Sequence, residues 1–501
     1  MELELNMQEL ECCEKTQCVV ISHEETMETA IPEYCPDIAR IVDAAGQLKI
    51  REKKLSGGRL TVGGTVKVTV LYTSEESSGL RSLILPVPFT CVVDDPRLSG
   101  CRSICAGGRL QLVEARAVTA RKIYVRVMPE FEVEGICKTK YSLCCGTGEE
   151  PSLHLRKEER EVQLLTNVLE RTFHFNQECL PEPGRGIPED LLLDRIGLRV
   201  TGCQRVSNKL IVKGEVSVSI LYRTEGQDLS SCDETLPFSQ ILDAAGLPEA
   251  GEYHAVAWAE DSDVRLVRTD GGVGFGVSMQ IGVMVRVYEK LMLQYIDDLY
   301  STRYETVVKK QKQEVGVISP TQNCRQEVVQ RLEFGQGRPF AWVSGLECSA
   351  VNVAPEGNKT ALHTNLRVKL LYLDESGVPV STEKTMEVTV LLPQLPDRAS
   401  AVCAPVVMNL DSNSCELRIP VDFFTEQTVR LNADTLTAVD LQEPAEKEKP
   451  SLVLRWIGAN ESLWEIAKAY RTDPAAVETA NGLEPGEPLP QGMLLIPKVR
   501  G

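Results

Sequence analysis

An eight-residue pattern of alternating apolar and polar positions occurs three times along the chain, at Thr65–Tyr72, Glu215–Tyr222 and Asn365–Tyr372. The tyrosines that close the three copies are 150 residues apart in both intervals. Each copy ends on apolar residues before a turn, and the alternation is typical of a strand with one buried face. Three copies at one interval predict a tandem array of a single domain type.

Further alternating stretches accompany each copy in the same order, separated by turns that contain glycine or proline. We therefore expect three repeats, at residues 15–145, 162–300 and 315–440. Many short strands with frequent turns predict a mainly β chain in which each repeat is a β-sandwich or a β-barrel-like domain. The periodicity does not choose between these two. Segments such as Lys157–Leu169 are compatible with short helices, but strands dominate.

A glycine interrupts the repeated strand at equivalent positions of the first two copies, Gly64 and Gly214, whereas the third copy has Thr364. Glycine inside a strand marks a bulge or a sharp bend. We expect such a bend in the first two repeats and a softer or differently placed one in the third. The first two repeats also share a Pro-Phe pair after this strand, which ends at Phe89 and Phe238.

The end of the chain does not follow the repeat. Residues 441–451 are charged and contain prolines, which predicts a tethering linker. Residues 452–498 then predict a small βααβ domain that begins with the strand Leu452–Ile457 and returns with the strand Met493–Pro497.

The two helices of this small domain have recognisable ends. Ser462, followed three residues later by Glu465, predicts the N-cap of the first helix. Asp473 before Pro474 predicts the start of the second helix, and Gly482 suits its left-handed end.

The composition is ordinary for a globular protein, with 43% hydrophobic and 25% charged residues. A formal net charge of −18 without a basic run argues against nucleic acid or anionic lipid as the main partner. No segment approaches the roughly 18 apolar residues that a transmembrane helix needs, and the first residues lack the features of a signal peptide. We expect the protein to stay in the compartment where it is made.

The chain has 17 cysteines but no C-x-x-C pair, so neither a zinc ribbon nor a thioredoxin-type motif is predicted. Free thiols in a reducing cytoplasm are the expectation. Cross-linking in an assembly that is later exposed to oxidants is the alternative.

Motifs for catalysis are missing from the sequence. There is no P-loop, no H-E-x-x-H zinc motif and no G-x-S-x-G nucleophile elbow. The glycine-rich stretch Gly271–Gly276 precedes a strand rather than a helix, so we interpret it as a loop and not as a dinucleotide site. We expect no catalytic residue, no metal site and no cofactor, and we expect that the protein is not an enzyme.

The small domain resembles a LysM domain through Ser462–Ala467, Asn481–Leu483 and Leu489–Pro497. LysM domains bind glycans that contain N-acetylglucosamine, but this chain has Asn460-Glu461 where the family has Gly-Asp, which puts sugar binding in doubt. The resemblance implies partner-binding or glycan-binding residues in the loops, namely Asn460, Glu461, Ser462, Asn481, Gly482 and Leu483. Trp456 is a further candidate if its side chain is exposed, because tryptophan is enriched at binding hot spots. For Trp464 and Tyr470 we expect packing within the domain core.

The repeats, with their strands ending in Leu-Tyr, resemble the SPOCS domain of spore-coat proteins. Three such repeats before a LysM domain are similar to spore-coat assembly proteins. The resemblance implies a non-enzymatic scaffold of the mother-cell cytoplasm, recruited to the forespore surface. It would bind a coat morphogenetic ATPase through LysM and other coat proteins through its repeats.

The sequence is compatible with two other functions, of which the second is disfavoured. A peptidoglycan-binding protein of the spore cortex or cell wall is the alternative, with LysM as the binding domain and the repeats as spacers. A wall hydrolase targeted by LysM is disfavoured, because no repeat carries a catalytic constellation.

Overall fold

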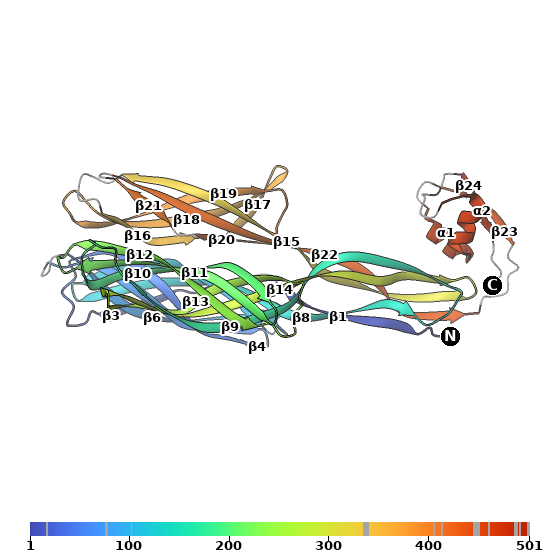
Figure 1. Cartoon of the computed structure of the whole chain (residues 1–501), viewed down its shortest axis with the longest axis horizontal. Helices are drawn as coiled ribbons and strands as arrows, with labels where there is room; N and C mark the ends of the chain where they lie inside the picture. Colours follow the sequence, from blue (N-terminus) through green and yellow to red (C-terminus); the bar gives the residue numbers. More distant parts are fainter. Residues whose placement is uncertain are drawn as a thin grey trace.

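A computed structural model describes the chain at residues 1–16, 19–75, 79–101, 103–333, 340–403, 406–411, 414–443, 451–458, 461–484, 489 and 492–497. The predicted mainly β class is confirmed. Figure 1 shows an elongated molecule whose shorter strands gather in groups at one end. Long two-stranded ribbons run from these groups into a common stalk, and a small helical module lies beside its far end.

The strands divide into three β units and a C-terminal module. The first unit contains β1 (Leu5–Lys15), β2 (Val19–Ser22), β3 (Glu25–Ala30), β4 (Arg40–Ser56), β5 (Arg59–Thr73), β6 (Leu80–Asp94), the 3-10 turn η1 (Pro96–Leu98), β7 (Ser103–Thr119) and β8 (Lys122–Thr147). The second contains β9 (Leu153–Cys179), β10 (Pro188–Val206), β11 (Lys209–Thr224), β12 (Leu229–Asp243), β13 (Glu252–Thr269) and β14 (Gly272–Ser301).

The third unit contains β15 (Glu305–Glu333), β16 (Ala341–Cys348), β17 (Asn352–Glu356), β18 (Lys359–Leu373), β19 (Pro379–Leu392), β20 (Arg398–Cys403), β21 (Val407–Leu410) and β22 (Ser414–Gln442). The module contains β23 (Leu452–Ile457), α1 (Leu463–Tyr470), α2 (Pro474–Asn481) and β24 (Gly492–Pro497). Strands β1, β9 and β15 begin about ten residues before the predicted starts of the repeats, because their first halves build the stalk.

Two separate antiparallel sheets form each β unit. In the first unit the sheet β4-β5-β6 packs against the sheet that β8 forms with β1, β2, β3 and β7. In the second the sheets are β10-β11-β12 and β13-β14-β9. Apolar side chains from both sheets fill one core per unit. Of the two architectures that the sequence left open, this arrangement is the sandwich.

The repeated strand shows why its end is apolar on both faces. In β5, Val66, Val68 and Val70 point into the sandwich core and are fully buried. Leu71 points the other way and is also fully buried, because that face meets the other two units. An alternating strand therefore gains an apolar pair where both of its faces are covered.

Equivalent leucines of the three repeats meet in one cluster. Leu71, Leu221 and Leu371 are each 0% exposed and belong to the same buried group, with Trp342 beside them. Identical positions of three repeats come together only where the copies surround a common axis. The three units thus form a closed arrangement with approximate three-fold symmetry inside one chain.

Each pair of neighbouring units also shares a polar contact. The Nζ of Lys67 lies 2.9 Å from Oδ1 of Asp194, which joins the first unit to the second. The indole N–H of Trp342 donates to Oγ of Ser219 at 3.0 Å, which joins the third to the second. Oγ of Ser344 donates to Oδ2 of Asp43 at 2.6 Å, which joins the third to the first.

The stalk is built from the distal halves of three ribbons, β1 with β8, β9 with β14, and β15 with β22 (Figure 1). Its interior is a second apolar core to which every ribbon contributes. The buried side chains at its centre include Cys12, Leu143, Leu164, Leu293 and Val315. Because each ribbon alone has only two strands, its stability depends on this mutual packing.

A buried charged cluster lies where the ribbons leave the sandwiches. Arg286 of the second unit lies 2.9 Å from the carboxylate of Glu134 in the first unit and 3.7 Å from that of Glu426 in the third. Arg398 also contacts Glu134, and Lys15 contacts Glu426. Both carboxylates thus have two cationic partners each, which a buried charge requires.

The predicted strand bends are present in the first two units. The partner strands carry one extra residue opposite the glycines, between Ile50 and Glu52 in β4 and between Val200 and Gly202 in β10. In the third unit the partner is interrupted outright between β16 and β17.

Two local predictions were wrong. Lys157–Leu169 is part of the strand β9, because its apolar residues pack on β14 and on the stalk core rather than along a helix face. Most of Gly271–Gly276 belongs to β14 rather than to a loop, since it continues the hairpin with β13.

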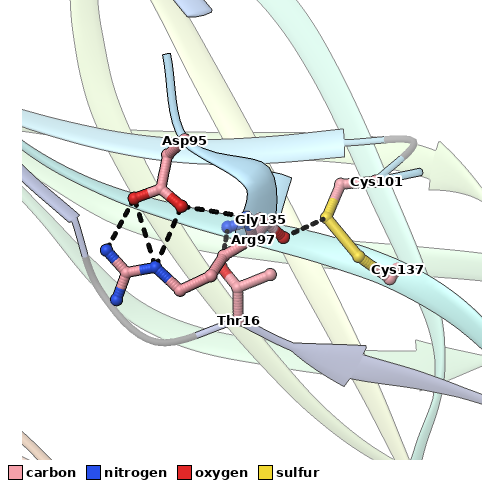
Figure 2. The surroundings of a disulfide bond; sticks show 6 residues. All are labelled: Thr16, Asp95, Arg97, Cys101, Gly135 and Cys137. Carbon is pink, nitrogen blue, oxygen red and sulfur yellow. Dashed lines mark hydrogen bonds and ion pairs between the residues drawn. A yellow bond between two sulfur atoms is a disulfide. The ribbon is translucent and has the colours of Figure 1, made fainter. Parts of the chain in front are cut away.

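The expectation of free thiols fails at one pair of cysteines. Cys101 and Cys137 form a disulfide, shown in Figure 2 beside Thr16 and Gly135. The turn after η1 lays Cys101 onto β8, and a Cβ at Gly135 would lie only 2.7 Å from its sulfur. The missing side chain of Gly135 therefore leaves the space that the disulfide occupies.

Candidate partner-binding module

The module has the predicted βααβ order, both helices begin at the predicted caps, and the second ends at the predicted Gly482. Oγ of Ser462 accepts from the backbone N–H of Glu465 at 3.2 Å. Oδ1 of Asp473 accepts from the N–H of Ala475 at 3.1 Å, and Gly482 is left-handed with φ of 65°. These caps stabilise helices of only eight residues each, which would be marginal alone.

One face of the two-stranded sheet is apolar and exposed. Trp456 is 73% exposed and Leu454 60% on β23, and Met493, paired directly with Trp456, is 65% exposed on β24. Leu452, at 51%, extends the same face. A contiguous exposed apolar surface that contains tryptophan and methionine is typical of an interaction site. We call these four residues the apolar face.

The opposite side of β23 explains why the apolar face points outward. Val453 and Ile457 pack on the module core with α1 and α2. Arg455 lies between them, and its guanidinium pairs with Glu461 and stacks 5.7 Å from the ring of Tyr470. Arg455 is the only polar residue of this strand, and its side chain lies on the inner side.

The first loop that was predicted to bind is occupied by internal contacts. Both carboxylate oxygens of Glu461 are engaged, one by Arg455 and the other by the N–H of Gly458 at 3.3 Å. Ser462 is the N-cap of α1. Asn460 lies outside the described residues.

The second predicted loop also has structural roles. The amide of Asn481 donates to the carbonyls of Val477 and Leu495 at 2.8 and 2.6 Å, and its oxygen accepts from the N–H of Leu495 at 2.8 Å. Gly482 ends α2, and Leu483 packs partly on the module core. Among the predicted binding residues with described positions, Trp456 presents a large apolar side chain to solvent, and Ser462 is exposed as well but its hydroxyl caps α1.

The module is attached to the stalk through α1. The indole N–H of Trp464 donates to Oδ2 of Asp298 at 2.8 Å, and Nζ of Lys468 lies 2.7 Å from Oδ1 of the same carboxylate. Asp298 is only 5% exposed and lies at a bulge of β14 in the stalk. Trp464 therefore does not pack in the module core as expected, whereas Tyr470 does so partly.

Aromatic contacts surround this junction. The ring of Tyr300 lies 5.0 Å from that of Trp464 in an edge-to-face arrangement, and its hydroxyl donates to the carbonyl of Thr472 at 2.8 Å. The guanidinium of Arg156 lies 5.7 Å from the ring of Trp464. We call Asp298, Tyr300, Trp464 and Lys468 the latch.

Charge and burial act in opposite directions on Asp298. Burial raises the pKa of its carboxyl, but the hydrogen bonds from Lys468 and Trp464, with the charges of Lys468 and Lys310, outweigh burial. The net pKa lies below its usual value, so the carboxylate is ionised at neutral pH and holds Lys468 as an ion pair.

Sequence reasoning identified Trp456 but missed the rest of the apolar face and the latch. The sequence contained a signal for the apolar face. Every residue of Leu452–Ile457 except Arg455 is apolar, so both faces of this strand carry apolar side chains. The latch had no local signal, since Asp298 and Trp464 are 166 residues apart.

A cavity of about 540 Å³ lies between the second and third units. In its polar wall, Oγ of Ser219 accepts from Trp342 and donates to Asp233, whereas Nε of Arg195 is buried without a hydrogen-bond partner. We regard it as part of the contact between units rather than as a reaction site.

The family model for the SPOCS domain of SipL matches residues 37–104 and 189–267. The two segments cover the sheets β4-β5-β6 and β10-β11-β12 with their flanks, at equivalent places in the first two units. The chain carries tandem SPOCS domains of the SipL type. This SipL-like protein is therefore connected with sporulation and the spore coat. The matched residues leave the third unit out, so its membership stays a prediction.

None of the curated proteins matches the chain. In the part of the chain that is described, no helix is long and apolar enough to cross a membrane.

Proposed function

We propose that the chain is a non-enzymatic scaffold of spore-coat assembly. In this proposal the C-terminal module is a LysM domain that binds the coat morphogenetic ATPase, and the SPOCS domains bind other coat proteins. The protein acts in the mother-cell cytoplasm and is recruited to the forespore surface. The apolar face around Trp456 is the observation that carries the proposal.

The chemistry of the apolar face favours a protein partner. Trp456 and Met493 form a cross-strand pair of large, exposed, apolar side chains. Such pairs bind apolar side chains of another protein well, because tryptophan buries a large area and methionine adapts its shape. In the described parts of the loops that would hold a glycan, the polar groups of Glu461 and Asn481 are engaged inside the module.

The latch supports a scaffold role because it orients the module. Helix α1 faces the stalk through Trp464 and Lys468, while the apolar face lies on the sheet and stays open. The module is at the end of the stalk remote from the SPOCS domains (Figure 1). One partner would be bound at the far end of the stalk and others at the SPOCS domains. Because these sites belong to one chain, binding at one raises the effective concentration at the others, which adds avidity.

The proposal assigns the protein binding alone. Over the described residues no group of three or more histidine, cysteine, aspartate or glutamate side chains is placed to hold a metal ion.

The test is binding of the full chain to the purified ATPase, with the double variant Leu454→Ser, Trp456→Ser. Because truncation of a central tryptophan costs 2 kcal/mol or more at a hot spot, we expect affinity to fall by roughly thirtyfold or more. Met292→Ser is the matched control, since Met292 is 59% exposed on the stalk strand β14. Equal binding by wild type and the double variant would refute the role of the apolar face.

A parallel pull-down with purified peptidoglycan separates the alternative function. Retention of the full chain on peptidoglycan, unaffected by the double variant, would favour a glycan-binding protein. Binding to the ATPase without retention on peptidoglycan would favour the scaffold.

A further inference from the structure

Two thiols of the third unit are in contact without being bonded. The sulfur atoms of Cys348 and Cys403 are 3.0 Å apart. This separation is about 1 Å longer than a disulfide bond. The two residues are 55 positions apart in sequence, so the fold brings them together.

The pair bridges the two sheets of the third sandwich. Cys348 ends β16 in the sheet with β18, and Cys403 ends β20 in the sheet with β22. Both side chains are half-buried and pack on the edge of the same core. A bond between them would tie together two sheets that are otherwise joined there by packing alone.

The two thiols share one hydrogen bond, and either sulfur can be its donor. Ionisation of one thiol is stabilised by the proton that the other keeps. Either cysteine can therefore supply the attacking thiolate, while its partner keeps its proton until a base removes it.

We propose that Cys348 and Cys403 are an oxidisable pair that closes to a disulfide on reaction with a low-molecular-weight disulfide. The thiolate of one cysteine attacks one sulfur of the small disulfide, forms a mixed disulfide and expels one small thiolate. That thiolate takes the proton of the other cysteine, whose sulfur then attacks the sulfur of the first and expels the second small thiolate. Two cysteine thiols are oxidised, and one small disulfide is reduced to two thiols.

This site differs from Cys101–Cys137, which is already closed in the first unit. The protein accordingly has two states that differ in the third unit: an open one, and a closed one in which the loop from 348 to 403 is covalently pinned. A disulfide across such a loop restricts the unfolded chain, so closure raises the unfolding midpoint of the third unit.

The experiment treats the folded full chain with oxidised glutathione, blocks the remaining thiols and maps the disulfides by mass spectrometry without reduction. We expect a peptide pair that joins Cys348 to Cys403 and a loss of about 2 Da for the two hydrogens removed. Complete alkylation of both cysteines after this treatment, or a bond from Cys348 to a different cysteine, would overturn the proposal.

Single variants test whether closure passes through a mixed disulfide. Cys403→Ser should accumulate glutathione on Cys348, or Cys348→Ser should accumulate it on Cys403, because the attacking sulfur then has no partner to expel the glutathione. Cys324→Ser, a half-buried free cysteine of the same unit, is the control and should leave the linkage intact. No glutathione on the remaining cysteine of either variant would refute this route. If either variant fails to fold, the wild-type map alone decides whether the pair closes.

Discussion

The ring of Phe89 lies directly over Gly64 across the β5–β6 pair. A Cβ at Gly64 would approach Cζ of that ring to 2.9 Å and the carbonyl oxygen of Lys49 to 2.1 Å. Gly214 and Phe238 repeat the relationship in the second unit, with 2.2 Å to Cζ. In the third unit the same pair of positions holds Thr364 and Val388. The large ring is thus present where the facing residue is glycine.

The third unit shows what a side chain at this position requires. Thr364 is 2% exposed, and its hydroxyl donates to the carbonyl of Ser349 at 2.8 Å. Ser349 lies in the interruption between β16 and β17, where the partner strand has moved out of the ladder. A side chain is therefore accommodated by a smaller facing residue together with a broken partner strand.

Gly64→Thr is predicted to destabilise the first unit by about 1–3 kcal/mol, the usual cost of overpacking. Adding Phe89→Val should recover only part of the loss, because the clash with the Lys49 carbonyl remains. Urea unfolding of the full chain, followed by exchange of first-unit amides, measures both effects. Gly107→Thr is the control, because a Cβ there has nothing within 4 Å. Full recovery by Phe89→Val would contradict the role of the carbonyl.

The leucine cluster on the common axis leads to a second prediction. Leu221→Ala should cost about 2–5 kcal/mol, because a fully buried leucine is removed from a site that three units share. Leu71→Ala and Leu371→Ala should have similar costs if the axis is approximately symmetric. Calorimetry should show a lower midpoint for more than one unit in each variant. A loss confined to the unit that carries the substitution would argue against a shared core.

The sequence was sufficient for the features that depend on local patterns. The 150-residue interval, the strand class, the bends at Gly64 and Gly214 and the caps Ser462 and Asp473 all follow from alternation, glycine placement or cap chemistry. The bends could be predicted because a glycine within an alternating strand marks a bulge.

Contacts between distant segments could not be predicted in this way. The apolar end of each repeated strand indicated burial. The sequence of a single repeat does not indicate that Leu71 and Leu221 belong to the same buried cluster. The expectation that Lys157–Leu169 could be a helix was wrong, because the apolar residues of a stalk strand lie on the side that faces the other ribbons. The latch depends on a pairing of Asp298 with Trp464 that no local pattern encodes.

Arg286→Met is predicted to destabilise the protein strongly, by about 3–5 kcal/mol, because it removes one cation from two buried carboxylates. Glu134 would keep Arg398, and Glu426 would keep Lys15, so the units should separate more easily without every contact being lost. Equilibrium urea unfolding measures the change. Arg265→Met, at an exposed arginine of β13, is the matched control. A variant as stable as that control would show that the cluster contributes little.

The latch should open in acid and in the variant Asp298→Asn. The pKa of Asp298 is depressed in the docked state, so the stability from this group is fully present above the undocked value of about 3.9 and is lost as pH falls through the docked pKa. Asn still accepts from Trp464 but no longer pairs with Lys468. Since a hydrogen bond to a charged group is worth about 1.5–3 kcal/mol, the docking equilibrium should fall by roughly tenfold or more.

The indole N–H resonance of Trp464, assigned with Trp464→Phe, reports docking of the latch directly. In the wild-type protein we expect it to keep its docked position at neutral pH and to move toward the exposed position below about pH 4. Asp298→Asn should show the exposed position already at neutral pH, while Asp434→Asn, at an exposed stalk carboxylate, should not. A resonance that stays docked in Asp298→Asn would mean that the aromatic contact with Tyr300 holds the module without the ion pair.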